Sequence, residues 1–267
     1  MRLFQSMTVA VLTLGLTGAV AGAEDAAMNT VTATGFIDKT LVKDGATVRY
    51  VLYVPRGYDA AREWPLVVFL HGAGERGSDG LIQSDVGMGH AIRKNPERFP
   101  CLVLMPQCPP DRFWDVMFDD IEKMMEATRK DYRVDSARIS LTGLSMGGYA
   151  TWLWGPNKLD VFAALMPVCG GGDPRDLKHL ISVEMDVDRY GTVQERLPKL
   201  ATVPIWAFHG RKDDVVPPVR TRQMVEKVKE AGGDVKHTEY PEDGHNCWDS
   251  TYGDPENIAW LLGQRHK

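Results

Sequence analysis

A serine in a glycine-rich turn is the residue of this sequence best placed to act as a nucleophile. Ser145 lies in the run Gly143-Leu144-Ser145-Met146-Gly147-Gly148, directly after the apolar stretch Ile139 to Thr142. The pattern G-x-S-x-G is typical of a tight turn from a strand into a helix, which exposes the serine hydroxyl. Small residues are needed two positions before and after the serine because side chains there would collide across the bend. The sequence therefore predicts nucleophilic chemistry at Ser145.

An acid and a histidine that could activate this serine follow it in the chain. Asp213 comes just after a buried-strand pattern that ends at Gly210, and His245 comes just after the strand pattern Lys236 to Tyr240. The order serine, acid, histidine is that of α/β-hydrolases and differs from the other folds that carry such a triad. Asp214 is the alternative acid, but the spacing after Gly210 favours Asp213.

A glycine-rich loop upstream is suited to binding the oxygen of a reacting carbonyl group. The loop His71 to Gly77 follows the apolar run Pro65 to Leu70. Glycines allow the backbone to turn its N–H groups inward, where they can form half of an oxyanion hole. We assign the N–H groups of Ala73 and Met146 as the two donors. The His71 side chain is expected to be structural, since a backbone donor does not require it.

The elements that must position these residues alternate along the chain. The first two strands are expected to form an antiparallel pair. Alternation of strands and helices predicts an α/β fold, a mostly parallel twisted sheet with helices on both faces. Ligands of such sheets bind at the carboxyl ends of the strands, where Ser145, Asp213 and His245 all fall. The predicted strands are 36–42, 48–54, 66–71, 102–106, 139–142, 163–168, 204–209 and 236–240, and the predicted helices are 115–131, 146–154, 219–231 and 257–264.

Length and composition fit one exported domain. Residues 1–23 are predicted to be a signal peptide, with Arg2, an apolar stretch from Met7 to Val20, and Ala21-Gly22-Ala23 as the cleavage site. Residues 24–267 are then a single domain, secreted or periplasmic, with no stable membrane anchor after cleavage. Hydrophobic residues make up 43% and charged residues 25% of the chain, as in ordinary globular proteins. A net charge of −5 without a basic stripe argues against a nucleic-acid partner.

The cysteines and histidines give no metal-binding pattern. Neither H-E-x-x-H nor paired C-x-x-C occurs, so we expect no metal and no other cofactor. Export permits disulfides among Cys101, Cys108, Cys169 and Cys247. An extended strand between Cys101 and Cys108 would hold them ~20 Å apart, too far to bridge. Two alternatives stay open: a disulfide between two of Cys108, Cys169 and Cys247, or buried cysteines that are all unpaired.

Two further features concern the substrate pocket. A connection of 35 residues separates Val168 from Pro204, and its apolar side chains within a charged segment suggest a small helical lid at about 175–200. The alternative is a solvated loop with one amphipathic turn. Trp114 and Trp248 flank the expected site and are predicted to line an aromatic or sugar-binding pocket, with packing around the site as the alternative.

With these motifs the chain resembles the secreted α/β-hydrolase carboxylesterases related to polyhydroxybutyrate depolymerases and to feruloyl and acetyl-xylan esterases. Some members of that group are labelled predicted peptidases. The resemblance covers about residues 36–264. It implies that Ser145, Asp213 and His245 are the triad and that Ala73 and Met146 are the oxyanion donors. It is carried by Leu70 to Gly77, Pro106 to Pro109, Gly143 to Gly148, Cys169 to Asp173, His209 to Pro217, and Gly244 to Trp248.

Three functions are consistent with these patterns. The first is a secreted serine carboxylesterase acting on short-acyl or aromatic esters, free or linked to a carbohydrate. The second is a serine peptidase of the same fold acting on small peptides. The sequence shows no recognisable propeller or gating domain, which argues against it. The third is a non-catalytic binding scaffold. The presence of every catalytic element argues against it.

Overall fold

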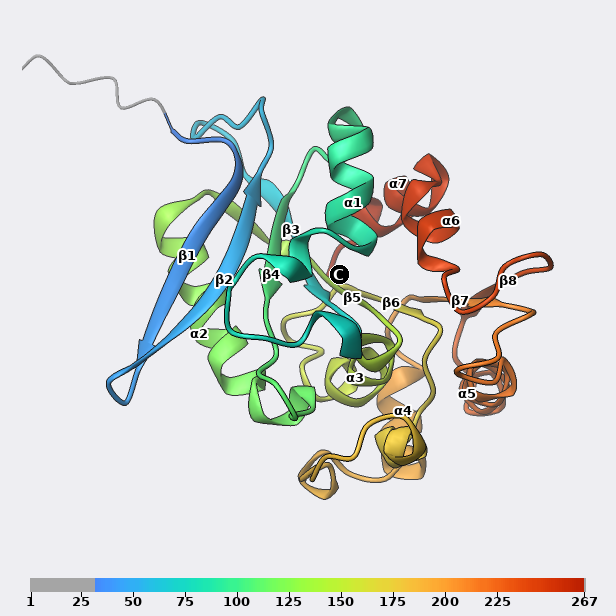
Figure 1. The fold of residues 1–267 in the computed structure, drawn as a ribbon. Coiled ribbons are helices and arrows are strands. Elements are labelled where there is room, and N and C mark those ends of the chain that lie inside the picture. Colours follow the sequence, from blue (N-terminus) through green and yellow to red (C-terminus); the bar gives the residue numbers. More distant parts are fainter. Residues whose placement is uncertain (1–31, 267) are drawn as a thin grey trace, which may run out of the picture. The chain divides into compact units, whose positions relative to one another are not determined.

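Eight strands form one twisted sheet in the computed structural model, which describes residues 32–266 (Figure 1). Their order across the sheet is β1-β2-β4-β3-β5-β6-β7-β8. β1 pairs with β2 and β2 with β4 in antiparallel fashion, and all other neighbours are parallel. The mostly parallel sheet predicted from the sequence is confirmed. The strands are β1 Gly35–Lys43, β2 Ala46–Val54, β3 Trp64–Leu70, β4 Leu102–Pro106, β5 Val134–Leu144, β6 Ala164–Val168, β7 Ile205–Gly210 and β8 Val235–Tyr240.

The antiparallel entry to the sheet is a tight hairpin. Lys43 pairs with Ala46, which leaves Asp44 and Gly45 as a two-residue loop between β1 and β2. Both loop residues have positive φ, 49° at Asp44 and 78° at Gly45. Asp-Gly is a favoured pair for such a turn, because its backbone twist matches that of the flanking strands.

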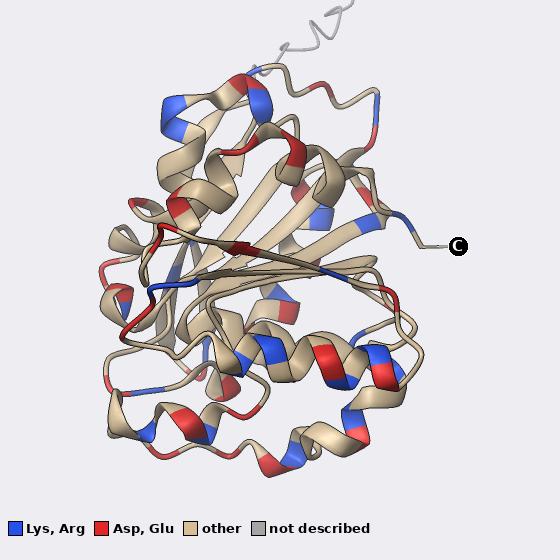
Figure 2. Ribbon diagram, turned by 90° about the vertical axis from the view of Figure 1, so that its right-hand side faces the viewer, with Lys and Arg blue, Asp and Glu red and all other residues tan. Residues whose placement is uncertain are grey.

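Helices cover both faces of the sheet because the strand side chains alternate between two cores (Figure 2). Leu66, Val68 and Leu70 of β3 belong to a core shared with α2, α3, α4 and α5. Val67 and Phe69 belong to a second core shared with α1, α6 and α7. The helices are α1 Gly87–Lys94, α2 Phe118–Asp131, α3 Met146–Trp154, α4 Val193–Leu200, α5 Val219–Glu230, α6 Trp248–Gly253 and α7 Pro255–Gly263.

The predicted helices differ from the observed ones mainly at their ends. The helix expected at 115–131 begins as a separate 3-10 turn, Trp114–Val116, and continues as α2 from Phe118. α1, α4 and α6 were not predicted as helices in their own right. The predicted signal peptide lies outside the described residues.

The segment predicted as a lid is helical in part and is anchored at both ends. It contains 3-10 turns at Pro174–His179 and Asp188–Tyr190, followed by α4. Leu177, Ile181 and Leu197 are buried in the core below it. Between the turns, the Asp186 N–H donates to a carboxylate oxygen of Asp115 at 2.6 Å. Coverage of an acyl pocket by this segment stays a prediction.

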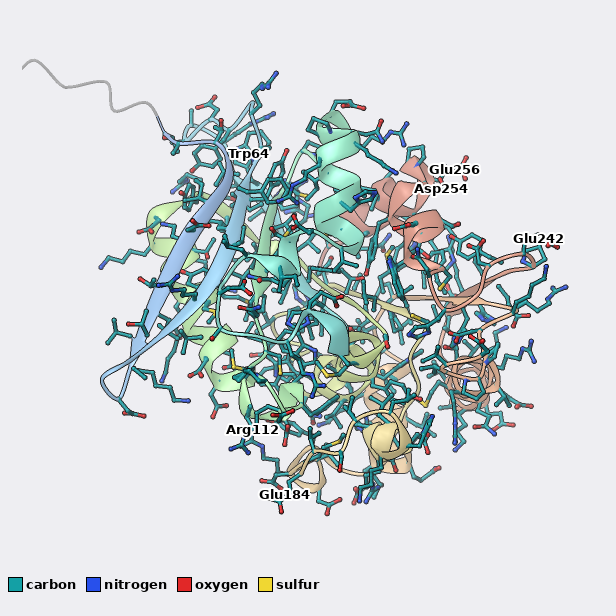
Figure 3. All side chains as sticks on the ribbon, in the orientation of Figure 1. Trp64, Arg112, Glu184, Glu242, Asp254 and Glu256 are labelled. Carbon is teal, nitrogen blue, oxygen red and sulfur yellow. The ribbon has the colours of Figure 1, made fainter. Side chains whose placement is uncertain are left out.

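A cavity opens between this segment and the residues that precede α2. Its volume is about 670 Å³, and its walls are mostly charged and polar. Arg112 and Glu184, which line it, lie at the same end of the molecule in Figure 3.

The outer surfaces of the helices carry both signs of charge. Figure 2 shows Lys and Arg interspersed with Asp and Glu along the helices. None of the helices in residues 32–266 combines the length and the apolar character that a membrane-spanning helix needs.

Arg196 fastens α4 to the rest of the fold. It is buried, and its guanidinium donates to the carbonyl oxygens of Trp152 and Gly172, each at 2.7 Å. Burial lowers the pKa of Arg196 to about 10.

We expect Arg196→Met to lower the free energy of unfolding by about 2 kcal/mol in urea titrations, because two buried carbonyl groups lose a charged donor. The control Lys199→Met, at an exposed position on the same helix, should change it by less than about 0.5 kcal/mol. Equal stability of both variants would contradict this role.

Candidate active site

Ser145 stands at the sharp turn between β5 and α3. Its backbone has φ 51° and ψ −115°, a strained conformation that is rare for a residue with a side chain. A Cβ atom added to Gly147 would lie 2.0 Å from the Leu70 carbonyl oxygen, and one added to Gly143 would lie 2.5 Å from the Gly147 carbonyl oxygen. The expected need for glycine on both sides of the serine is confirmed.

Ser145, His245 and Asp213 form one hydrogen-bonded chain. Nε2 of His245 lies 3.0 Å from Oγ of Ser145. Nδ1 of the same ring lies 2.8 Å from Oδ2 of Asp213. A carboxylate only accepts hydrogen bonds, so the proton of a neutral His245 ring is held on Nδ1, and Nε2 is free to accept the serine proton. The loops after β5, β7 and β8 bring the three residues together, although His245 follows Ser145 by 100 positions and Asp213 by 32 positions in the sequence.

Both carboxylate oxygens of Asp213 have hydrogen-bond partners. Its Oδ1 accepts the backbone N–H groups of Val215 and Val216 at 2.9 and 2.8 Å. Burial by itself would raise its pKa, but hydrogen bonds from His209, His245 and Val216 hold that pKa far below the usual range of an aspartate. Asp214, the alternative acid, is exposed. The geometry thus places Asp213, and not Asp214, against His245.

His209 is a part of the site that sequence reasoning missed. It is the penultimate residue of β7 and has no exposed surface. Its Nε2 lies 3.1 Å from Oδ2 of Asp213, the same oxygen that faces His245. The run His209-Gly210 before the acid was visible in the sequence, but nothing there indicated a contact with Asp213.

The loop after β3 lies beside the serine. A Cβ atom added to Gly72 would lie 3.6 Å from Cβ of Ser145. Ala73 begins a short 3-10 turn, and Met146 is the first residue of α3. Among the hydrogen bonds of residues 32–266, neither backbone N–H group is used as a donor. The assignment of these two amides as oxyanion donors stays a prediction.

Contacts with the end of β4 hold this loop in place. Nε2 of His71 accepts the Cys108 N–H at 2.9 Å, and Nδ1 lies close to the Gly72 carbonyl oxygen at 2.6 Å. The His71 side chain is fully buried, and burial lowers its pKa to about 4. Gln107 accepts from the Gly80 N–H at 2.7 Å. The structural role expected for His71 agrees with these contacts.

The two tryptophans predicted to line a pocket have different surroundings. Trp114 has no exposed surface, and its Nε1–H donates to the His71 carbonyl oxygen at 3.2 Å. The prediction that it lines an open pocket is corrected, because the ring packs beneath the loop at 4.7 Å from the His71 ring. Trp248 is half-buried, and its ring lies edge-on to the His245 ring at 5.3 Å. It stays a candidate for contact with substrate.

The cysteines are free and buried, so none of the disulfides left open from the sequence is present in the described residues. Sγ of Cys169 accepts the Ser145 N–H at 3.2 Å. In residues 32–266, Cys169, Asp213 and His245 are the only group of metal-ligating residue types whose donor atoms lie within 4.8 Å of one another. Burial, followed by a hydrogen bond with Cys247, raises the pKa of the Cys169 thiol, and the other two groups already bind each other. The thiol therefore stays protonated, while the carboxylate and the imidazole are engaged with each other.

Comparison with known proteins agrees with this fold. A thermostable esterase of known structure superimposes with a TM-score of 0.71 and 34% identity over 86% of this chain and 63% of the other. A feruloyl esterase module from Clostridium thermocellum, complexed with sinapinate, superimposes with a TM-score of 0.63 and 18% identity over 87% and 90% of the two chains. The second likeness shows the fold alone.

Sequence comparison gives the family. Endo-1,4-beta-xylanase Y of Acetivibrio thermocellus is 27% identical over 153 residues, which are 49% of this chain and 14% of that protein. The chain thus spans one part of that longer relative. The prolyl oligopeptidase family matches residues 113–262, more than half of the chain, including the turn at Ser145 and the loops of Asp213 and His245. The chain therefore has the α/β-hydrolase fold and belongs to the prolyl oligopeptidase family.

Proposed function

We propose that this protein is a serine carboxylesterase that hydrolyses short-acyl or aromatic esters, including esters linked to carbohydrate. The observation that carries the proposal is the chain of hydrogen bonds from Ser145 Oγ through His245 to Asp213, with distances of 3.0 and 2.8 Å. Two unused amides beside the serine complete the set of groups that acyl transfer needs. Similarity to a thermostable esterase supports ester substrates.

The geometry supports the following reaction. His245 takes the proton of Ser145 as the hydroxyl oxygen attacks the ester carbonyl carbon. Asp213 holds the ring in the required tautomer and stabilises its positive charge. The N–H groups of Ala73 and Met146 donate to the tetrahedral oxyanion. His245 then protonates the leaving alcohol, and a water molecule attacks the acyl-enzyme by the same steps in reverse, which releases the acid and regenerates the serine.

The substrate class rests on the relatives and on the surface near the site. The feruloyl esterase module binds sinapinate, an aromatic acid, and a xylanase is among the relatives of this chain. Trp248 next to His245 offers an aromatic face to such an acyl group. We further infer export from the apolar leader and its A-x-A site at residues 21–23.

A peptidase function is the second candidate, because the matching family is named for an oligopeptidase. Both functions use the same three residues, so the site geometry does not separate them. The two functions are separated by their substrates. We would compare the rates of hydrolysis of p-nitrophenyl acetate, methyl ferulate and acetylated xylan with the rates of cleavage of p-nitroanilides of short peptides. We expect hydrolysis of the esters and little cleavage of the anilides. Faster cleavage of the anilides would favour the peptidase.

Covalent labelling tests the catalytic serine directly. We expect a fluorophosphonate to label the wild-type protein at Ser145 and to leave Ser145→Ala unlabelled, because only an activated hydroxyl attacks the reagent. Ser140→Ala, at a buried serine on strand β5 just before the turn, is the matched control and should be labelled like the wild type. Equal labelling of Ser145→Ala and wild type would contradict the proposal, and no labelling of either would support the binding scaffold.

A further inference from the structure

His209 stands behind the acid of the site, and the proposed function assigns it no role. We propose that His209 is a positioning residue for Asp213, and that it carries a proton on both ring nitrogens. The inference rests on the proposed role of Asp213 in catalysis. The hydrogen bonds of the buried ring determine both its position against Asp213 and its charge.

The Nε2 side of the ring requires a proton. Nε2 lies 3.1 Å from Oδ2 of Asp213 and 2.9 Å from the carbonyl oxygen of Val216. Both neighbours are acceptors, since the carboxylate is ionised and a carbonyl has no hydrogen to give. An unprotonated Nε2 would place three lone-pair groups against one another in a buried site, so Nε2 is a donor.

The Nδ1 side also requires a proton. Nδ1 lies 2.7 Å from Oγ1 of Thr221 on α5, and the same hydroxyl lies 2.6 Å from the carbonyl oxygen of Gly170. A hydroxyl has one proton to donate, and the Gly170 carbonyl can only accept it. The hydroxyl then offers a lone pair to His209, and Nδ1 must donate. With both nitrogens donating, the ring is a cation.

The surroundings can hold this charge. The side chains of His209 and Asp213 are both without exposed surface, and a buried charge is tolerated when it is paired and hydrogen-bonded. On the neighbouring strand β8, Glu239 pairs in register with His209, but its carboxylate is bound by Arg211 and Arg222. The other titratable and charged groups around this pair are His237, Glu239, Arg211 and Arg222 on the side of His209, and His245, Cys169 and Tyr149 on the side of Asp213.

Two consequences follow for catalysis. First, Oδ2 of Asp213 is held between two imidazole rings, and Oδ1 is held by two backbone N–H groups, so the carboxylate cannot turn away from His245. Second, a positive charge on the far side of Asp213 opposes protonation of His245. We therefore expect ester hydrolysis to extend to lower pH in the wild type than in a variant without this charge.

Three variants separate these effects when kcat and KM for p-nitrophenyl acetate are measured across pH. His209→Leu removes charge and donors, and we expect kcat to fall at least about tenfold with little change in KM. His209→Gln keeps a donor without the charge; we expect it to recover most of kcat, with the rising limb of kcat/KM moved about one pH unit higher. Thr221→Val keeps His209 but removes the acceptor at Nδ1, together with the hydrogen bond from the same hydroxyl to Gly170, and should move the limb in the same direction. Thr128→Val, another buried threonine on the remote helix α2, is the control and should leave the profile unchanged.

A measurement that does not depend on activity tests the charge. In wild-type protein labelled with ¹⁵N-histidine, we expect both ring nitrogens of His209 to show protonated-type chemical shifts at pH 7, with the signal assigned by its loss in His209→Gln. One unprotonated nitrogen would overturn the assignment of charge. Full kcat with an unshifted limb in folded His209→Leu would overturn the positioning role. A protein that cleaves no ester but shows the doubly protonated ring would contradict the proposed function alone.

Discussion

Asp213→Asn is expected to lower kcat about 10⁴-fold. Each carboxylate oxygen of Asp213 accepts from two donors: the N–H groups of Val215 and Val216 at one oxygen, and the rings of His209 and His245 at the other. An asparagine amide has one oxygen and one NH₂ group, so in either orientation its NH₂ meets two donors. If it faces His245, the proton of that ring moves to Nε2, which can then no longer accept the proton of Ser145.

The neighbouring aspartate provides the matched control. Asp214 is exposed, and Asp214→Asn makes the same chemical change one residue away. We expect kcat for p-nitrophenyl acetate to stay within about twofold of the wild type, because an exposed charge is well screened. Circular dichroism of both variants checks that they are folded. A large loss in Asp214→Asn with an active Asp213→Asn would reverse the assignment of the acid.

The meeting of Ser145, Asp213 and His245 could be anticipated because each follows a strand with a clear sequence pattern. The carboxyl ends of parallel strands meet at one edge of a sheet, so residues just beyond them come together even when they are 100 positions apart. The strained turn at Ser145 was also visible, because glycine is required at fixed positions around it. For these residues, local sequence and the general properties of parallel sheets were sufficient.

The surroundings of the site could not be read in the same way. Trp114 was expected at the substrate, but its burial depends on the His71 loop, 43 positions away in the sequence. His209 appeared to be an ordinary strand residue, and its role depends on Thr221 and Gly170, which come from two other segments. Such contacts arise from how elements pack, and a single sequence carries no periodic signal for them.

The missed helix α1 has a related explanation. It contains Gly87 and Gly89, and glycine is among the poorest helix-forming residues. A Cβ atom on Gly89 would lie 2.0 Å from the Ser84 carbonyl oxygen, so close packing requires glycine there. Met88 and Ile92 are buried against the sheet and stabilise the helix through tertiary contacts. Intrinsic propensity alone therefore predicts a loop at this position.

The protein is expected to lose about 3 kcal/mol of stability between pH 7 and pH 4 through His71 alone. Burial lowers the pKa of His71 from 6.5 to about 4, with a smaller contribution in the same direction from the charge of Arg76. Between these two pH values the unfolded chain binds a proton at His71 that the folded protein does not. Stability therefore falls as the pH drops from about 6.5 to about 4, and this contribution is constant above and below that window. Urea unfolding at several pH values measures the effect.

His71→Gln isolates this contribution, because glutamine does not titrate and its amide oxygen can still accept the Cys108 N–H. We expect the variant to be less stable than the wild type at pH 7 and the difference to shrink by about 3 kcal/mol at pH 4. The comparison is needed because burial raises the pKa of nearby Glu75, which acts on stability in the opposite direction. His179→Gln, at an exposed histidine, should follow the wild-type curve. A difference between His71→Gln and wild type that stays constant with pH would show that His71 takes up its proton in the folded protein as readily as in the unfolded chain.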